Sequence, residues 1–385
     1  MLSPESRALG PSELIAGLAE QCGRLAFPLL RLNMSLRTLH PEVLALTLRW
    51  DRQTGLTSAR MPYTIIQTPQ YVGSPVARVI DGEGSFAVSF ERGERPPHPA
   101  YEELAALGAT EYLIQPLVFQ DGRRTFISWT TDRPGGFGAE GFAQLEALLP
   151  LLTLRLELSA AYFATESLLE VYLGRQASGR VLSGAFQRGT GTSIDAALWY
   201  CDMRGFTGLG DTLSPQALVG LLDRYFEALA GPIAEQGGEI LKFVGDALLA
   251  IFPVGAEGPK VACRAALTAA EGALAAMPSV EVPDGKGPLA IGIGLHLGQV
   301  MYGNIGARDR LDFTVIGGSV NEVARVEALC KDAGAPLLLT ESFRKAVDRA
   351  DLVEVGRFQL RGVSAPQDIF TVEHLRAGNS PVPVP

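Results

Sequence analysis

The chain has 385 residues, of which 47% are hydrophobic and 19% are charged. This composition predicts a folded protein of two or more domains and excludes a largely disordered chain. The formal net charge of −9, with no cluster of lysine and arginine among aromatic residues, argues against a surface that binds nucleic acid.

The cysteines and the apolar stretches predict the cellular compartment of the protein. Cys22, Cys201, Cys263 and Cys330 are far apart and form no CxxC pair, so we expect reduced thiols and neither disulfides nor a zinc site. The first residues lack the features of a secretion signal, and no window approaches the ~18 uninterrupted apolar residues of a membrane span. We therefore expect a soluble, cytoplasmic protein that does not contact a membrane.

The first part of the chain alternates helical and strand patterns, which predicts an α+β domain over residues 1–173. A hairpin is expected at residues 112–132, because Asp121-Gly122 suits its turn. The other expected elements are a strand at Glu42–Trp50 and helices at Tyr101–Leu107, Ala139–Leu149 and Leu151–Leu173. The last of these helices repeats apolar residues at Leu158, Tyr162, Leu169 and Tyr172. This spacing fits a coiled coil and equally an ordinary helix that closes the domain.

Residues 174–192 are rich in Gly, Ser, Arg and Thr without strong periodicity, which predicts a linker. The Pro-rich residues 376–385 predict a disordered tail. Between them, residues 193–375 read as one domain with a βαββαβ core, which is a ferredoxin-like order. Its expected elements are a strand at Ala196–Met203, a helix from Ser214-Pro215 to Gln236, a hairpin of Ile240–Val244 and Ala247–Phe252, a helix at Pro259–Ala276, a strand pair in 291–306, a strand at 310–317, a helix at Asn321–Cys330, the apolar run 336–340, a short helix and two closing strands.

Two carboxylates stand out in this domain. Asp202 ends an apolar strand and Asp246 occupies a hairpin turn, and each alone has a local explanation, as a helix cap or a turn residue. In this kind of fold the two positions can lie side by side, and paired carboxylates without histidine or cysteine suit Mg²⁺ or Mn²⁺. The free backbone amides of Phe206, Thr207 and Gly208 can then meet a metal-bound polyphosphate. His296 lies in an apolar strand and is expected to be structural.

Asn321 and Arg325 are four residues apart, so they project from one face of the expected helix. Such a pair is usually part of a solvated face. An arginine aimed at a metal-bound phosphate would, however, stabilise the charge that develops during phosphoryl transfer.

Four motifs in this order resemble the catalytic domain of the class III nucleotidyl cyclases, the adenylyl/guanylyl cyclase family. They are YCDMRGFT, GGEILKFVGDALLAIF, IGLHLGQVMYGNIG with FTVIGGSVNEVAR, and FQLRGVSAPQDIFTV. The resemblance implies that Asp202 and Asp246 bind two metal ions, Mg²⁺ or Mn²⁺, with the Met203 carbonyl as a further ligand. It also implies that Asn321 orients the ribose and Arg325 stabilises the transition state.

The resemblance further implies a base-reading pair, Lys242 and Thr314, and a phosphate-contacting residue, Arg361. Lysine implies adenine, since an ammonium group can donate to adenine N1, whereas guanine-specific relatives carry glutamate. The implied enzyme is an adenylyl cyclase that converts ATP into 3′,5′-cyclic AMP and pyrophosphate. Because one chain holds both sets of residues, the resemblance implies a homodimer with two composite sites. A silent nucleotide-binding signalling scaffold and a guanylyl cyclase are the alternatives.

The N-terminal residues TDRPGGFGAEGFAQLEALLPLL, which follow a hairpin, resemble the end of a GAF-type sensor domain covering roughly residues 15–165. This resemblance implies regulation of the catalytic domain by an unknown small-molecule or protein signal. An unrelated dimerisation module is the alternative.

Overall fold

The computed structural model describes residues 10–25, 27–283, 288–363 and 365–376, and it divides into two compact units, Met1–Val171 and Tyr172–Pro385. Each unit has its own hydrophobic core. The division falls near the end of the predicted N-terminal domain at residue 173. The predicted disordered tail lies, apart from Arg376, outside the described residues.

The N-terminal unit is built on an antiparallel sheet in the order β3-β2-β1-β6-β5-β4. Glycines with positive φ, Gly55 and Gly122, permit the tight connections after β2 and β5. The predicted hairpin at 112–132 is present as β5 and β6. The strands are β1 (Arg31–Arg37), β2 (Val43–Asp51), β3 (Gly55–Pro62), β4 (Phe86–Ser89), β5 (Glu111–Val118) and β6 (Arg124–Thr131).

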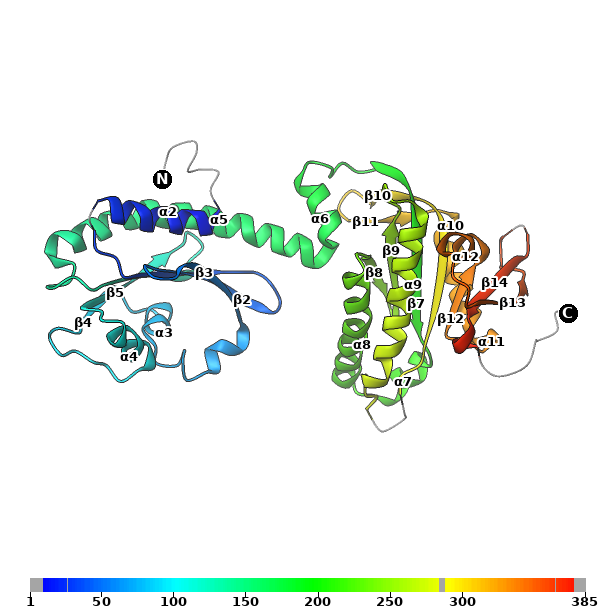
Figure 1. Cartoon of the computed structure of the whole chain (residues 1–385), viewed down its shortest axis with the longest axis horizontal. Helices are drawn as coiled ribbons and strands as arrows, with labels where there is room; N and C mark the ends of the chain where they lie inside the picture. Colours follow the sequence, from blue (N-terminus) through cyan, green and yellow to red (C-terminus); the bar gives the residue numbers. More distant parts are fainter. Residues whose placement is uncertain (1–9, 26, 284–287, 364, 377–385) are drawn as a thin grey trace. The chain divides into compact units, whose positions relative to one another are not determined.

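Helices cover both faces of this sheet, which gives three layers (Figure 1). On one face, α2 (Pro11–Arg24) and α5 (Gly138–Leu173) bury side chains against Leu32, Met34 and Trp129. On the other face lie η1 (Tyr63–Gln67), α3 (Pro75–Ile80) and α4 (Pro99–Ala106), and the last two pack around Tyr112 and Phe126. This second face is less completely filled by side chains and contains a cavity.

One helix of 36 residues, α5, replaces the two helices predicted on either side of Pro150, which lies inside it. Leu152, Leu156 and Ala160 are buried against the sheet, whereas Leu158 and Tyr162 of the predicted seam are 66% and 64% exposed. Helix α5 is long and apolar enough for a membrane span by length and composition, but a single such helix is weak evidence. The cytoplasmic location stays a prediction.

The second unit contains the predicted βαββαβ order, with neighbouring strands β10-β7-β9-β8. The side chains of β7 alternate, so that Trp199 and Cys201 face α8 and α9 while Ala196 and Leu198 face α6 and α10. Ser214 caps α8 by accepting a hydrogen bond from the amide of Ala217, as the sequence predicted. The core elements are β7 (Gly191–Met203), α8 (Pro215–Glu235), β8 (Glu239–Val244), β9 (Ala247–Pro253), α9 (Pro259–Ala276) and β10 (Ile291–Gly306).

The remaining elements extend this sheet. Strand β11 pairs with the second half of β10, and β12, β14 and β13 follow on the other edge. Helix α10 packs on β10 and β7 (Figure 1). These elements are β11 (Leu311–Ile316), α10 (Gly318–Ala328), α11 (Cys330–Ala333), β12 (Leu337–Thr340), α12 (Glu341–Val347), β13 (Leu352–Phe358) and β14 (Gln367–Val372).

One sequence prediction in this region is wrong, and one segment contains a helix that the sequence did not predict. Residues 291–306 form one long strand instead of a pair, because β10 pairs with β7 along almost its whole length and its glycines do not turn the chain. The segment predicted as a linker contains a helix, α6 (Arg175–Leu182). Buried Glu239 accepts hydrogen bonds from the amide of Ala177 and the hydroxyl of Tyr302, which docks α6 onto β8.

His296 lies in the core of the second unit, where burial lowers its pKa to about 4. Its Nδ1 is 3.1 Å from Thr340 Oγ1 and 3.7 Å from a Glu322 carboxylate oxygen, but the effect of burial on the pKa dominates. Because the unfolded histidine titrates near pH 6.5, the unfolded state binds more protons between about pH 4 and 6.5, and stability falls as the pH falls through that range.

We predict that this histidine removes about 1–2 kcal/mol of stability at pH 5 relative to pH 7.5, given the two pKa values. Urea unfolding of wild type and His296→Gln at both pH values measures the difference, which should shrink in the variant. The exposed His374→Gln serves as the control. An equal pH dependence in all three proteins would contradict the buried, uncharged histidine.

Candidate active site

The two predicted carboxylates meet at one cavity of the second unit. Asp202 is close to the end of β7, and Asp246 lies in the two-residue turn between β8 and β9, where Gly245 has a φ of 64°. Cys201 pairs with Leu248 in the β7–β9 ladder, so the strand end and the turn are neighbours. Both aspartates line a cavity of about 580 Å³.

The negative charges of the two carboxylates affect each other. Burial, together with the nearby charge of Asp246, raises the pKa of Asp202 to about 6. A bound cation would remove both penalties. Among the described residues no group of three or more His, Cys, Asp or Glu side chains could hold a metal. Two carboxylates leave positions for substrate oxygens, which fits Mg²⁺ better than a closed all-protein site.

The loop after β7 forms another wall of this cavity. Gly205 adopts a left-handed conformation, with φ of 75°, and starts the short helix α7 (Phe206–Thr212). Met203, Phe206 and Thr207 line the cavity, whereas Gly208 is exposed and is not one of the lining residues. The first amides of α7 have no partner within the helix, so they are available to an anion.

An ion pair that the sequence analysis missed supports the wall of the cavity. Arg204 Nη2 lies 2.7 Å from Glu327 Oε1, and only 5% of the glutamate side chain is exposed. Burial raises the pKa of Glu327 to about 7, with Arg204 opposing the shift and Asp202 adding to it. The pair joins the loop after β7 to α10. Arg204 stands inside the motif YCDMRGFT and Glu327 lies two residues after FTVIGGSVNEVAR, but nothing in their spacing predicts that they touch.

Lys331 was also missed, although it lines the same cavity at the start of α11. It is exposed, and it follows the α10 motif by only a few residues. A lysine there places an ammonium group beside two carboxylates and a helix start. The position of Lys331 depends on the turn between α10 and α11, and no sequence pattern predicts that turn.

The predicted base-reading residues lie elsewhere. Lys242 is exposed on β8 and Thr314 is buried on β11, and these two strands contact each other. The Thr314 hydroxyl oxygen is buried without a hydrogen-bond partner among the described residues. Neither residue lines the cavity that holds Asp202 and Asp246.

Asn321 and Arg325 occupy α10, as predicted, with Asn321 exposed and Arg325 half-buried. A Cβ atom built on Gly362 would lie 3.4 Å from the Arg325 guanidinium nitrogens, so the turn that carries Arg361 adjoins Arg325. Within one chain, neither Asn321 nor Arg325 lines the cavity of the two carboxylates. The predicted site residues therefore form two groups.

Comparison with known proteins identifies this part of the chain. Residues 192–373 match the family described as adenylate and guanylate cyclase catalytic domain. An adenylate cyclase of Anabaena cylindrica is 33% identical over 157 residues, which cover 40% of this chain and 31% of that protein. Adenylate cyclase 1 of Rhizobium meliloti (strain 1021) is 29% identical over 194 residues, covering 49% of this chain and 29% of that protein.

A solved structure of a bacterial light-regulated adenylyl cyclase is 21% identical, with a TM-score of 0.50, and covers 69% of this chain and 87% of that one. At this identity the likeness concerns the fold alone. The chain spans about a third of the length of the curated relatives it matches. Residues 192–373 nevertheless match the cyclase catalytic domain that the motifs predicted.

The approach of α10 to the sheet depends on a glycine in β10. A Cβ atom at Gly294 would lie 2.6 Å from the Val323 carbonyl oxygen and 2.7 Å from the Glu327 amide nitrogen. Because both are backbone atoms, the helix would have to move. We predict that Gly294→Ala destabilises the protein by about 1–3 kcal/mol and lowers any activity that depends on α10.

Urea unfolding checks this prediction against Gly220→Ala in α8, where the added Cβ would lie 3.6 Å from the flexible end of Arg224. The control should be neutral or slightly stabilising, because alanine favours helix. Equal stability of the two variants would contradict the close packing at Gly294.

Proposed function

We propose that the protein is an adenylyl cyclase that converts ATP into 3′,5′-cyclic AMP and pyrophosphate at sites shared by two copies of the chain. One observation carries the proposal: the predicted Asn321, Arg325, Lys242 and Thr314 of the same chain do not line the cavity that holds both aspartates. A second copy would supply them. The match to the cyclase family and to adenylate cyclases supports the reaction and its substrate.

Asp202 and Asp246 are the residues that would hold the two divalent cations, Mg²⁺ or Mn²⁺, with the Met203 carbonyl as a further ligand. When bound, such cations neutralise the triphosphate and stabilise the charge on the reacting oxygens. Burial and the nearby charge of Asp246 raise the pKa of Asp202, which supports this role because a bound cation would offset both effects. The amides of Phe206, Thr207 and Gly208 would hold the phosphates.

In the reaction, the 3′-hydroxyl oxygen of ATP forms a bond to its own α-phosphorus and its proton passes to solvent water, while the bond from that phosphorus to the α–β bridging oxygen breaks and pyrophosphate leaves. Asn321 would orient the ribose so that the 3′-oxygen faces the phosphorus. Arg325 would donate hydrogen bonds to the phosphate as negative charge develops, with Arg361 beside it. The half-buried position of Arg325 supports this role, because its charge is less screened than at the surface.

Lys242 and Thr314 would read the adenine ring. The buried Thr314 hydroxyl without a partner supports this role, because a hydroxyl so placed is normally satisfied. The exposed Lys242 can reach a base held mainly by the other copy. Large apolar residues exposed nearby on β8, β10 and β11 favour a dimer contact at these strands; they are Phe243, Val244, Met301 and Ile316.

The N-terminal unit would regulate the catalytic domain through helices α5 and α6. Helix α5 runs into α6, and α6 docks through Glu239 onto the strand that carries Lys242. The exposed Leu158 and Tyr162 of α5 favour a helix contact in the dimer. A GAF-like sensor domain would act through this connection.

We predict that Asp246→Asn lowers cyclic AMP formation by about 100-fold or more, because it removes several kcal/mol of metal-dependent stabilisation while keeping a turn-compatible residue. Purified full-length protein, ATP and Mg²⁺ or Mn²⁺, with chromatographic detection of the product, measure the loss. Wild type without cyclic nucleotide product from ATP or GTP would contradict the enzyme and favour a silent scaffold.

Mixing two inactive variants tests whether each site is shared between two copies of the chain. Asp246→Asn and Arg325→Ala should each be inactive alone, because each removes one half of every site. An equal mixture should recover about a quarter of wild-type activity, since half of the dimers are mixed and each mixed dimer has one intact site. No recovery, with mixed dimers verified by two different affinity tags, would contradict a site shared between copies.

We predict that Lys242→Glu shifts the ratio of ATP to GTP turnover toward GTP by about tenfold or more, because a carboxylate accepts from the N1–H and amino groups of guanine. Product formation from each nucleotide measures the shift. Lys260→Glu, which changes a surface lysine paired with Asp348, is the charge-matched control. An unchanged ratio for Lys242→Glu would remove this lysine from base recognition.

A further inference from the structure

The N-terminal unit contains a large cavity that the proposed reaction does not use. Its volume is about 680 Å³, and it lies between the sheet and the helices η1, α3 and α4 that cover one of its faces. Cavities of about 300–1,000 Å³ are typical of sites for small molecules. The space is therefore sufficient for a ligand of metabolite size.

The floor of this cavity is polar although β1 is a central strand. Leu32, Met34 and Leu36 of β1 are fully buried on the opposite face, against α2 and α5. The intervening residues point into the cavity, and they include Asn33 and Ser35. Central strands of a sheet covered on both faces are normally apolar on both. Polar residues at alternate positions therefore indicate a polar occupant on this face.

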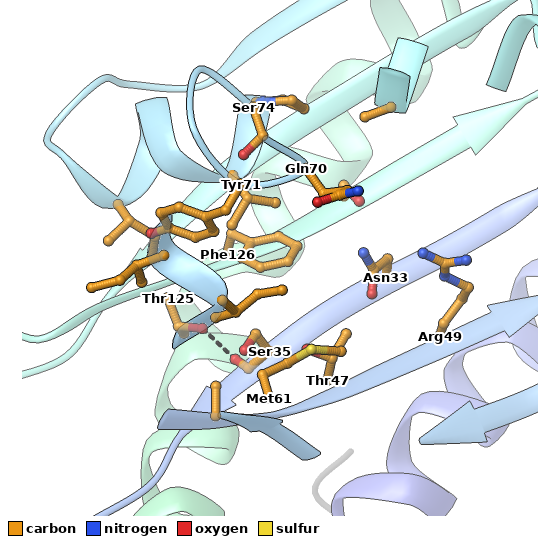
Figure 2. A pocket seen from close by; sticks show the side chains of 18 of the residues that line it. Asn33, Ser35, Thr47, Arg49, Met61, Gln70, Tyr71, Ser74, Thr125 and Phe126 are labelled. Atoms are coloured by element: carbon orange, nitrogen blue, oxygen red, sulfur yellow. Dashed lines mark hydrogen bonds between the residues drawn. The ribbon is translucent and has the colours of Figure 1, made fainter. Parts of the chain in front are cut away.

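Strand register gathers hydrogen-bonding groups into a row. Asn33 pairs with Arg49 of β2 on one side and with Ser128 of β6 on the other. Residues directly opposite each other in adjacent strands have Cβ atoms about 4.5–5.5 Å apart, so the three side chains form a continuous row. Figure 2 shows Asn33 and Arg49 next to each other in the cavity, with Ser35 and Thr47 as the neighbouring pair.

Two polar groups of the cavity wall lack partners among the described residues. The side-chain oxygen of Asn33 and the Nε2 atom of His98 are both buried without a hydrogen bond. His98 Nδ1 accepts the amide hydrogen of Ala100, so the proton of the neutral ring is on Nε2, which is a donor. Unsatisfied buried polar groups are rare, and two beside one cavity indicate a ligand.

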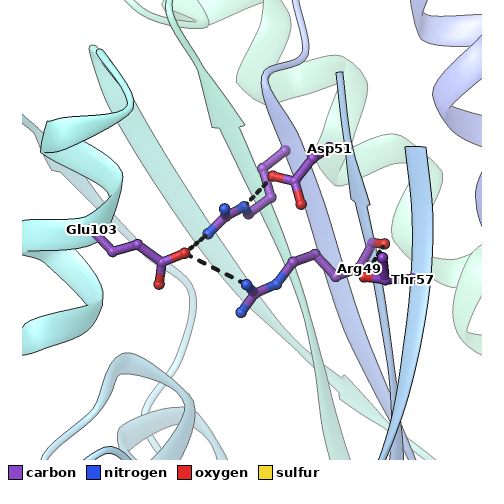
Figure 3. Close-up of polar contacts among 5 residues, drawn as sticks. Arg49, Asp51, Thr57 and Glu103 are labelled. Atoms are coloured by element: carbon purple, nitrogen blue, oxygen red, sulfur yellow. Dashed lines mark hydrogen bonds and ion pairs between the residues drawn. The ribbon is translucent and has the colours of Figure 1, made fainter. Parts of the chain in front are cut away.

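The charges favour an anionic ligand. Four arginines line the cavity against two carboxylates, Asp81 and Glu103. Arg31 is neutralised by Asp51 at 2.5 Å and by Glu103 at 2.7 Å. Arg49 reaches Glu103 only at 3.5 Å and keeps 41% of its side chain exposed, as Figure 3 illustrates. Arg49 therefore retains hydrogen-bond donors for a further acceptor.

The rest of the wall is apolar and partly aromatic. The rings of Tyr71 and Phe126 and the side chain of Met61 line it, together with Ile65 and Val76 from η1 and α3. In Figure 2 the Tyr71 and Phe126 rings lie away from Arg49. One end of the cavity thus suits a flat apolar body and the other end suits a charged group.

We propose that this cavity binds a small organic acid, with an aromatic body against Tyr71 and Phe126 and a carboxylate or phosphate at Arg49 and Asn33. A guanidinium group can hold either anion through two parallel hydrogen bonds, so the chemistry is shared. Binding requires no cyclase activity, so the proposed function and this site can fail separately.

Isothermal titration calorimetry on the full-length protein tests the site with a defined panel. Phenyl, indolyl and naphthyl bodies are each offered as a carboxylate, a phosphate, a neutral alcohol and an amine. The expected result is binding by anionic members, with alcohols and amines of the same body at least about tenfold weaker. Comparing the carboxylates with the phosphates identifies which anion the site prefers.

Variants then assign the binding to this cavity. Arg49→Gln should weaken anion binding by about tenfold or more, whereas Arg133→Gln, which changes an exposed arginine outside the cavity, should leave it unchanged. Thr47→Tyr fills the space and should abolish binding, with thermal unfolding confirming the fold. The proposal is overturned if no anionic member binds, if alcohols or amines bind equally well, or if a folded Arg49→Gln or Thr47→Tyr protein binds like wild type.

Discussion

The close approach of two like charges is the constraint on which the catalytic unit depends. The β7–β9 ladder and the two-residue turn at Gly245-Asp246 bring Asp202 and Asp246 to one cavity. Strand pairing fixes the backbone on both sides, since Cys201 pairs with Leu248 and Val244 pairs with Ala247. Burial and, after it, the charge of Asp246 raise the pKa of Asp202, and a cation beside the two carboxylates would offset both effects.

The surroundings hold this arrangement rigid by unusually close packing. Gly292 leaves room for the Arg204–Glu327 pair, since a Cβ atom there would lie 1.8 Å from an Arg204 nitrogen. Gly294 lets the backbone of α10 approach β10. The same helix carries Asn321 and Arg325, so the packing that supports the carboxylates of one site also fixes the residues proposed for the other.

In the N-terminal unit, the alternation of side chains along the strands gives the two faces of the sheet different character. Its α2 and α5 face is a filled apolar core, whereas the opposite face keeps a polar floor, unpartnered groups and space. A domain that only dimerised would gain stability from filling that cavity. Helix α5 is followed in the chain by α6, which docks onto β8 through Glu239.

The sequence by itself determined several elements of the second unit, including helix α9 and the hairpin that carries Asp246, because local turn chemistry and periodicity decide such elements. Its motifs were also sufficient to identify the cyclase domain. Only the tertiary structure decided that residues 291–306 form one strand and that residues 175–182 form a helix, since long-range pairing and docking override weak local signals. The Arg204–Glu327 pair and the polar row of Asn33, Arg49 and Ser128 join residues far apart in the chain, and no local pattern encodes such contacts.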